Sequence, residues 1–320
     1  MKRLSLYIIT GLFLISFTNC KQKQREGTSN GIQGNISISG AFALYPLTVK
    51  WADEFEKLHP GVNIDISAGG AGKGMTDVLS DMVDLAMFSR EVAPEEEAKG
   101  AWKIGVSKDA VLPTMNASHP HLAEIQERGI TQHEFANIFL SPRETKWDAY
   151  LKSTPDKKIN VYTRSDACGA AAMWAEFLGK KQEDLIGIGV FGDPGIADAV
   201  RNDVWGIGFN NVIYAYNIST RKKYENLEII PIDLNENGKI DEDETFYNSL
   251  DDISQAIQNG IYPSPPARVL YLISNGKPTN KIAEEFLKFV LTEGQQYVHE
   301  AGYVKLDSVY LVNEYKKLDQ

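Results

Sequence analysis

Two successive strand–loop–helix units near the N-terminus constrain the fold of this chain more than any other feature. Residues 35–39 alternate polar and apolar side chains and predict a strand, and residues 62–67 predict a second one. A helix is expected after each strand, and Pro46 suits the first turn of the earlier helix. The apolar positions at helical spacing are Leu47, Trp51, Phe55 and Leu58 in the first helix and Met75, Val78, Leu79 and Met82 in the second. This alternation predicts an α/β sheet whose loops gather at the strand ends, where such folds bind ligands.

The rest of the chain continues the alternation of strands and helices. We expect further strands at residues 159–162, 206–209 and 268–274, and helices at 170–178, 195–202 and around 282–290. If the last strand and helix return to the first lobe, the chain crosses between two lobes near residues 105–118 and again near 263–272. Two lobes joined in this way can close around a ligand by hinge motion.

The first twenty residues have the layout of an export signal. Lys2 and Arg3 are basic, residues 4–17 are mostly apolar, and Cys20 follows the apolar run. A cysteine at this place resembles the lipidation site of bacterial lipoproteins. We therefore expect a signal peptide over residues 1–19, lipid on Cys20, and a polar tether over residues 20–34, which would hold the protein on a bacterial membrane facing the periplasm or the cell exterior. The alternative is a conventional signal peptide cut nearby, with Cys20 incidental.

Composition excludes some classes of partner. The chain has 33 basic and 43 acidic residues, a formal net charge of −10. No basic cluster interrupts this excess of acid, so we expect no nucleic acid partner. A small anion is not excluded, because a recessed local site can outweigh distant charges that salt screens. Cys20 and Cys168 are the only cysteines, so lipid on Cys20 leaves no intramolecular disulfide.

The segment 162–174 is the strongest candidate for a ligand site. Arg164 and Asp166 stand in a short turn, and the small residues Cys168, Gly169 and Ala170 open the predicted helix. The first N–H groups of a helix have no intrahelical partners, and the helix dipole places partial positive charge there. Together with the arginine they would form an anion socket that a compact oxyanion can reach. The alternative is an ordinary loop-to-helix junction in which Arg164 pairs with Asp166 or with solvent.

A second pattern, at residues 233–244, matches the twelve-residue calcium loop of an EF-hand. The expected ligands are Asp233, Asn235, Asn237, the carbonyl of Lys239, Asp241 through a water, and Glu244. Gly238 stands where the motif requires a sharp turn. Residues 227–234 suggest a strand rather than an entering helix, and no second loop of this kind exists, so we expect one structural Ca²⁺ that pins the loop to a helix around 246–257. The alternative is an acidic surface turn.

Several segments, in their order and spacing, resemble the substrate-binding proteins of phosphate ABC transporters. They lie at residues 39–47, 68–74, 83–90, 164–169, 192–195, 205–209, 268–272 and 301–306. The resemblance implies a two-lobed type II periplasmic-binding fold, with two mixed sheets flanked by helices and two hinge crossovers. Lobe 1 would comprise residues 35–110 and 268–320, and lobe 2 residues 111–267, including the calcium loop.

The same resemblance implies the residues of the anion site. They are Ala43, Leu44 and Tyr45 in a first loop, Gly70, Ala71 and Gly72 in a second, Ser89 and Arg90 in a third, and Arg164, Asp166, Cys168, Gly169 and Ala170 in a fourth. Arg164 would bind the anion, and the carboxylate of Asp166 would orient Arg164. Hydroxyl groups usual in this family are replaced here, for example by Cys168 and Ala170. Each lost charge-assisted bond removes about 1.5–3 kcal/mol of binding free energy.

We therefore expect a non-catalytic, monomeric solute-binding lipoprotein that passes inorganic phosphate or a related oxyanion to an ABC permease in the inner membrane. One alternative is a calcium-stabilised binding or adhesion module that kept the fold and lost phosphate transport. Another is an enzyme that uses Cys168 as a nucleophile at the start of a helix, where the pKa of a thiol is lowered.

Overall fold

The computed structural model describes residues 31–141, 143, 145–152 and 156–319. The predicted signal peptide and the lipidation site at Cys20 lie outside these residues. Residues 32–320 form one compact unit. Within the described part of the chain, no helix is both long enough and apolar enough to cross a membrane.

Strands and helices alternate along most of the chain. The strands are β1 (Gly34–Gly40), β2 (Val62–Ala68), β3 (Leu85–Phe88), β4 (Ala101–Asn116), β5 (Asn160–Arg164), β6 (Ile188–Val190), β7 (Gly206–Asn211), β8 (Leu227–Ile229) and β9 (Ala267–Asn275). The helices are α1 (Tyr45–Leu58), α2 (Ala71–Leu79), α3 (Pro94–Glu97), α4 (Leu122–Arg128), α5 (Gln132–Leu140), α6 (Gly169–Phe177), α7 (Gly192–Arg201), α8 (Val212–Ala215), α9 (Leu250–Gln258), α10 (Lys281–Leu291) and α11 (Ser308–Asp319). Short 3₁₀ turns lie at Trp147–Ala149, Gln182–Asp184, Glu242–Glu244 and Glu293–Tyr297.

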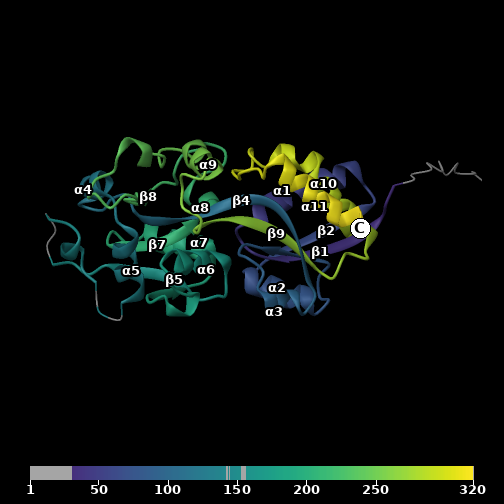
Figure 1. Cartoon of the computed structure of the whole chain (residues 1–320), viewed down its shortest axis with the longest axis horizontal. Helices are drawn as coiled ribbons and strands as arrows, with labels where there is room; N and C mark the ends of the chain where they lie inside the picture. Colours follow the sequence, from purple (N-terminus) through teal and green to yellow (C-terminus); the bar gives the residue numbers. More distant parts are fainter. Residues whose placement is uncertain (1–30, 142, 144, 153–155, 320) are drawn as a thin grey trace, which may run out of the picture. The chain divides into compact units, whose positions relative to one another are not determined.

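The strands form one continuous mixed sheet. Their order is β2-β1-β3-β9-β4-β7-β5-β6, and β8 pairs with β4. Strand β1 is parallel to β2 and β3, and β5 is parallel to β6 and β7, whereas β4 and β9 are antiparallel to each other. The two mixed sheets expected from the sequence are therefore joined, because β4 and β9 run side by side from one into the other (Figure 1). The register of β4 against β9 shifts between Gly105 and Ser107.

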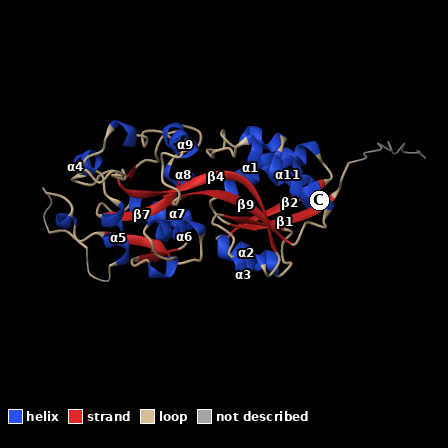
Figure 2. Cartoon of the chain, viewed as in Figure 1, coloured by secondary structure: helices blue, strands red, loops and turns tan. Residues whose placement is uncertain are grey.

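Two hydrophobic clusters lie on this sheet, one toward each end of β4. Ile104 and Val106 belong to one cluster, and Val111 and Leu112 belong to the other. Helices α1, α10 and α11 flank one face of the sheet around β1, and α2 and α3 flank the opposite face (Figures 1 and 2). The lobe boundaries expected from the sequence stay a prediction, since residues 32–320 form a single compact unit.

The elements expected near the N-terminus are confirmed, with differences at their ends. Pro46 lies in the first turn of α1, and Leu47, Trp51 and Phe55 are buried. Leu58, expected on the same face, is 63% exposed at the last residue of the helix. Met82 was expected in the second helix but is 71% exposed beyond its end. The helix stops before it because Asp81 takes the left-handed conformation, with φ 54°.

The strand expected at residues 227–234 is also shorter than the pattern indicated. Strand β8 ends at Ile229, two residues before Pro231. Proline has no N–H to donate to a neighbouring strand, so it limits the length of the pairing with β4. The residues that follow lead directly into the loop with the EF-hand pattern.

Candidate functional site

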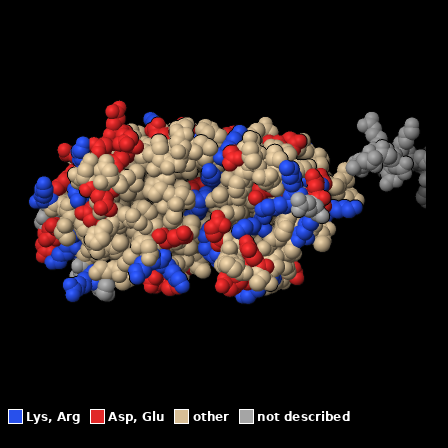
Figure 3. Space-filling view, viewed as in Figure 1, with Lys and Arg blue, Asp and Glu red and all other residues tan. Residues whose placement is uncertain are grey.

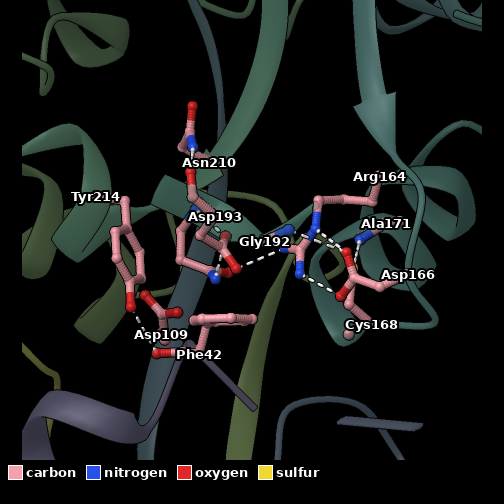
Figure 4. A network of polar contacts seen from close by, with 12 residues as sticks. Phe42, Asp109, Arg164, Asp166, Cys168, Ala171, Gly192, Asp193, Asn210 and Tyr214 are labelled. Carbon is pink, nitrogen blue, oxygen red and sulfur yellow. Dashed lines mark hydrogen bonds and ion pairs between the residues drawn. The ribbon is translucent and has the colours of Figure 1, made fainter. Parts of the chain in front are cut away.

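Arg164 is the centre of the site that the sequence singled out. It is the last residue of β5, and its side chain is 1% exposed. Its Nε and Nη2 donate to the two carboxylate oxygens of Asp166 at 2.8 and 2.6 Å, and its Nη1 donates to Oδ2 of Asp193 at 2.5 Å. Figure 4 shows the guanidinium lying between these two carboxylates. Burial opposes the charge, but the carboxylates of Asp193 and Asp166 outweigh it and raise the pKa of Arg164 above its usual value.

Several hydrogen-bond donors converge on the carboxylate of Asp166. Besides the two bonds from Arg164, its Oδ1 accepts the N–H of Gly192, the first residue of α7, at 3.1 Å. Gln182 fixes the turn by donating to the carbonyl of Asp166 at 2.7 Å and accepting the N–H of Cys168 at 3.1 Å. A guanidinium fork and a helix N-terminus thus converge on one negatively charged group, which is the arrangement an oxyanion requires.

Asp193 is a second carboxylate that sequence reasoning did not assign to the site. It is 2% exposed, and its Oδ1 accepts the side-chain amide of Asn211 at 2.6 Å. Its carbonyl accepts the side-chain amide of Asn210 at 3.1 Å. The segment 192–195 belongs to the family resemblance, but nothing local in it indicates that Asp193 reaches Arg164 from another element.

A further ion pair lies on the two long strands. Asp109 of β4 stands opposite Arg268 of β9 in register, and Nη2 of Arg268 donates to Oδ2 of Asp109 at 3.3 Å. Nη1 of the same arginine donates to the carbonyl of Gly169 at 3.0 Å, which ties the first residue of α6 to the crossing strands. Burial raises the pKa of Asp109 to about 6 despite this arginine.

The predicted second, third and fourth loops are brought into direct contact. The N–H of Gly72 donates to the carbonyl of Ala167 at 3.1 Å. A Cβ placed on Gly169 would lie 2.1 Å from the carbonyl oxygen of Ser89, so only glycine permits this approach. Gly70 and Ala71 are buried at the start of α2, where the N–H of Gly70 donates to the carbonyl of Gly40 at 3.0 Å.

The first loop contributes an aromatic ring rather than free N–H groups. The N–H groups of Leu44 and Tyr45 donate within their own turn, to Ala41 at 3.2 Å and to Phe42 at 3.3 Å. The ring of Phe42 lies 5.7 Å from the guanidinium carbon of Arg164, which the sequence did not predict. The carbonyl of Ala43 accepts the hydroxyl of Tyr303 at 2.7 Å and the carbonyl of Phe42 accepts that of Tyr214 at 3.1 Å, so this loop is tied to other elements.

Arg90, expected at the anion, points elsewhere. Its two terminal nitrogens donate to the carboxylate of Glu96 at 2.8 and 2.7 Å, and its guanidinium lies over the ring of Phe88. It lines a cavity of about 450 Å³ together with Gly72 and Cys168, beside the start of α6. Arg90 therefore does not share a ligand with Arg164 in this arrangement, because Glu96 engages both of its terminal nitrogens.

The start of α6 supplies the backbone donors. Cys168 is the N-cap residue, and its sulfur accepts the N–H of Ala171 at 3.4 Å. Gly169 and Ala170 follow as the first two helical residues, and N–H groups at these positions have no carbonyl partner within the helix. Burial raises the pKa of the Cys168 thiol to about 12, opposite to the lowering expected of a nucleophile at a helix start.

The balance of charge in the site is negative. Arg164 and Arg268 face three carboxylates, those of Asp109, Asp166 and Asp193, so the described groups carry one excess negative charge. On the face of the molecule drawn in Figure 3, acidic and basic side chains are interspersed. An oxyanion that binds here must therefore gain more free energy from hydrogen-bond donors than it loses through repulsion by the neighbouring carboxylates.

Comparisons with known proteins agree with this architecture. The family model described as a PBP superfamily domain matches residues 26–293. The phosphate-binding protein PstS of Staphylococcus epidermidis strain RP62A is 25% identical over 285 residues, covering 87% of this chain and 81% of that protein. PstS of Pseudomonas aeruginosa strain PAO1 is 25% identical over 318 residues, covering 91% and 88%.

Solved structures show the same fold. A Clostridium perfringens protein solved with bound phosphate superposes with a TM-score of 0.69 at 20% identity, covering 86% of this chain and 100% of that chain. An ABC-type phosphate transport receptor from Vibrio cholerae superposes with a TM-score of 0.62 at 17% identity, covering 85% and 100%. With a mixed α/β sheet, two crossing strands and a family model that covers most of its length, this chain belongs to the PBP superfamily and has the type II periplasmic-binding fold.

Proposed function

We propose that this protein is an exported solute-binding protein that captures an inorganic oxyanion, phosphate in the first instance, at Arg164. The observation that carries the proposal is the carboxylate of Asp166, which is held by the Arg164 fork and by the N–H of Gly192 at the start of α7. Donors that hold a carboxylate can also hold a phosphate, since each of these anions offers two oxygens that accept the two parallel N–H bonds of an arginine. The relatives named PstS support phosphate as the ligand.

Ligand entry requires the loops to separate. Gly169 and Ser89 are in contact, and Gly72 bonds to Ala167, so in this arrangement the α6 start is covered by the loops after β2 and β3. The crossing strands β4 and β9 connect the two hydrophobic clusters and would serve as the hinge. On opening, the N–H groups of Gly169 and Ala170 would become accessible beside Arg164.

Delivery to an ABC permease, a lipid anchor on Cys20 and a position outside the cytoplasm complete the proposal. The N-terminal layout and the PstS relatives support them. We propose no catalytic role, because a buried thiol with a pKa of about 12 is protonated near neutral pH and is a poor nucleophile.

Isothermal titration of the purified protein with phosphate, arsenate, sulfate and molybdate tests the proposal. We expect binding of at least one of these anions, and a loss of affinity of about tenfold or more in Arg164→Lys, which keeps the charge but loses the fork. Arg201→Lys is the matched control, since the Arg201 side chain lies partly exposed on α7 and, within the described part of the chain, bonds to Asp198 and to the carbonyl of Glu225. Equal affinity of wild type and Arg164→Lys would contradict the assignment of the site.

A second candidate function is a binding or adhesion module that kept the fold and lost anion transport. The full pairing of Arg164 by two carboxylates and the replacement of hydroxyls by Cys168 and Ala170 favour it. The same titration separates the two, because such a module would bind none of the four anions while unfolding cooperatively like a native protein.

A further inference from the structure

The loop at residues 233–244 lies between β8 and α9, away from the contacts of Arg164. Its sequence supplies each ligand type of an EF-hand at its required position, with glycine at the sixth place. It also supplies isoleucine, Ile240, at the eighth place. The oxyanion site does not use any of these residues, so the loop needs a separate explanation.

The two end residues of the loop are buried carboxylates without a cationic partner. Asp233 is 1% exposed and Glu244 is 3% exposed. Among the described residues, no lysine, arginine or histidine forms an ion pair with either one, and the lysine of the loop, Lys239, is bound to Asp241 instead. Burying two negative charges without a counter-charge is costly, and backbone dipoles offset only part of that cost.

Backbone N–H groups of the loop donate to both of these carboxylates. Oδ2 of Asp233 accepts the N–H of Gly238 at 2.8 Å, and Oε1 of Glu244 accepts the N–H of Leu234 at 2.7 Å. Oε2 of Glu244 accepts the N–H of Asp241 at 2.9 Å. An ionised carboxylate has about four acceptor positions, so each of these groups keeps capacity for a further partner.

Asparagine amides bind the third carboxylate in the way a cation would. The side-chain amides of Asn235 and Asn237 donate to Oδ2 of Asp241 at 2.9 and 2.6 Å, and the amine of Lys239 donates to its other oxygen. Among the described residues, no three Asp, Glu, His or Cys side chains converge as a ready-made metal site. The ligands of this loop include three such groups, those of Asp233, Asp241 and Glu244. The amide oxygens of Asn235 and Asn237 accept the N–H groups of Asn237 and Lys239 at 3.1 Å each, and each keeps a second lone pair for a cation.

The middle of the loop is fixed to the rest of the fold. The N–H of Ile240 donates to the carbonyl of Glu127 in α4 at 2.8 Å, and the N–H of Asp233 donates to the carbonyl of Ile130 at 3.2 Å. A Cβ on Gly129 would lie 2.4 Å from Cδ1 of Ile240, so a glycine makes room for this side chain. The turn after α4 thus supports a single loop that has no second EF-hand beside it.

We propose that the loop 233–244 binds one Ca²⁺, with the carboxylates of Asp233 and Glu244, the amide oxygens of Asn235 and Asn237, the carbonyl of Lys239 and a water held by Asp241 as ligands. The ion supplies the missing positive charge between the two buried carboxylates. With three carboxylates among the ligands, we expect a dissociation constant in the range of about 10⁻⁴–10⁻³ M that is usual for extracellular calcium modules. This site is independent of oxyanion capture at Arg164.

Calcium titration of the purified, EGTA-treated protein tests the proposal. Wild type is expected to bind one Ca²⁺, and Glu244→Gln to bind it at least tenfold more weakly, because it loses a bidentate carboxylate. Glu242→Gln is the matched control, since Glu242 is an exposed acid of the same loop outside the ligand set. Calcium is expected to raise the unfolding temperature of wild type and of Glu242→Gln but not of Glu244→Gln.

A gain-of-function variant keeps the test decisive if Glu244→Gln fails to fold. Asn237→Asp adds a ligand charge at an exposed position of the loop and is expected to tighten Ca²⁺ binding several-fold. No calcium binding by wild type, or equal weakening in Glu242→Gln and Glu244→Gln, would overturn the proposal. Unchanged or weaker binding in Asn237→Asp would do the same.

Discussion

Replacing Asp193 by asparagine should lower stability and strengthen anion binding at the same time. Asp193 is 2% exposed and pairs with Arg164 at 2.5 Å. Complete loss of one partner from a buried ion pair costs about 3–5 kcal/mol. The cost is expected to be smaller here, about 2–3 kcal/mol, because Arg164 keeps Asp166 and the new amide oxygen can still accept a hydrogen bond.

The gain in anion affinity follows from the same geometry. An anion that takes the place of Asp166 on Nη2 of Arg164 would sit across the guanidinium from Asp193, at about 7 Å from its Oδ2 given the flat fork. At an effective dielectric constant of about 20, a unit charge at that separation repels another by about 2 kcal/mol. Removing the charge of Asp193 should therefore tighten the complex with a monoanion roughly thirtyfold.

Two assays on the same samples check this prediction. Urea unfolding gives the change in free energy, and isothermal titration with phosphate gives the change in affinity. Asp198→Asn is the matched control, since Asp198 lies exposed on the same helix and contacts Arg201 at 3.4 Å; it should change neither quantity by more than about 0.5 kcal/mol. A fall in both stability and affinity in Asp193→Asn would instead show that the carboxylate supports anion binding rather than opposing it.

Three other substitutions or treatments have defined outcomes. Gly169→Ala should cost about 1–3 kcal/mol in urea unfolding, because its Cβ would meet the carbonyl of Ser89 at 2.1 Å; unchanged stability would show that the two loops separate freely. Burial raises the pKa of Asp109 to about 6, so the folded protein keeps a proton that the unfolded chain loses near pH 3.9. The free energy of unfolding should therefore fall by roughly 3 kcal/mol as the pH rises from about 4 to 6. Asp109→Asn should remove this dependence on pH. Iodoacetamide at pH 8 should leave Cys168 unmodified in the native protein and alkylate it in urea, and rapid labelling of the native form would contradict its burial.

The order of strands and helices could be read from the sequence because their periodicity is local. Leu47, Trp51 and Phe55 recur at helical spacing and are buried as that pattern predicts. The joining of two expected sheets into one could not be read, since pairing between β4 and β9 depends on contacts far apart in the chain. Met82 fails the helical pattern because Asp81, which looks ordinary in the sequence, adopts a left-handed conformation.

The candidate site divides in the same way. Arg164 and Asp166 are two residues apart in one turn, so their pairing was foreseeable from the sequence. Asp193 and Arg268 reach the site from other elements, and no local signal marks them. Arg90 was expected at the anion, but Glu96, six residues later, binds its guanidinium.

The position of a bound anion decides whether Arg164 is the ligand-binding residue. A crystal structure of the protein grown with saturating phosphate is expected to place a tetrahedral anion on the guanidinium of Arg164, within hydrogen-bond distance of the N–H groups of Gly169 and Ala170. The contact between Gly169 and Ser89 should be lengthened by the ligand, since the present approach leaves no room for a side-chain atom. An anion bound elsewhere, with Arg164 still bridging Asp166 and Asp193, would show that Arg164 is not the anion site.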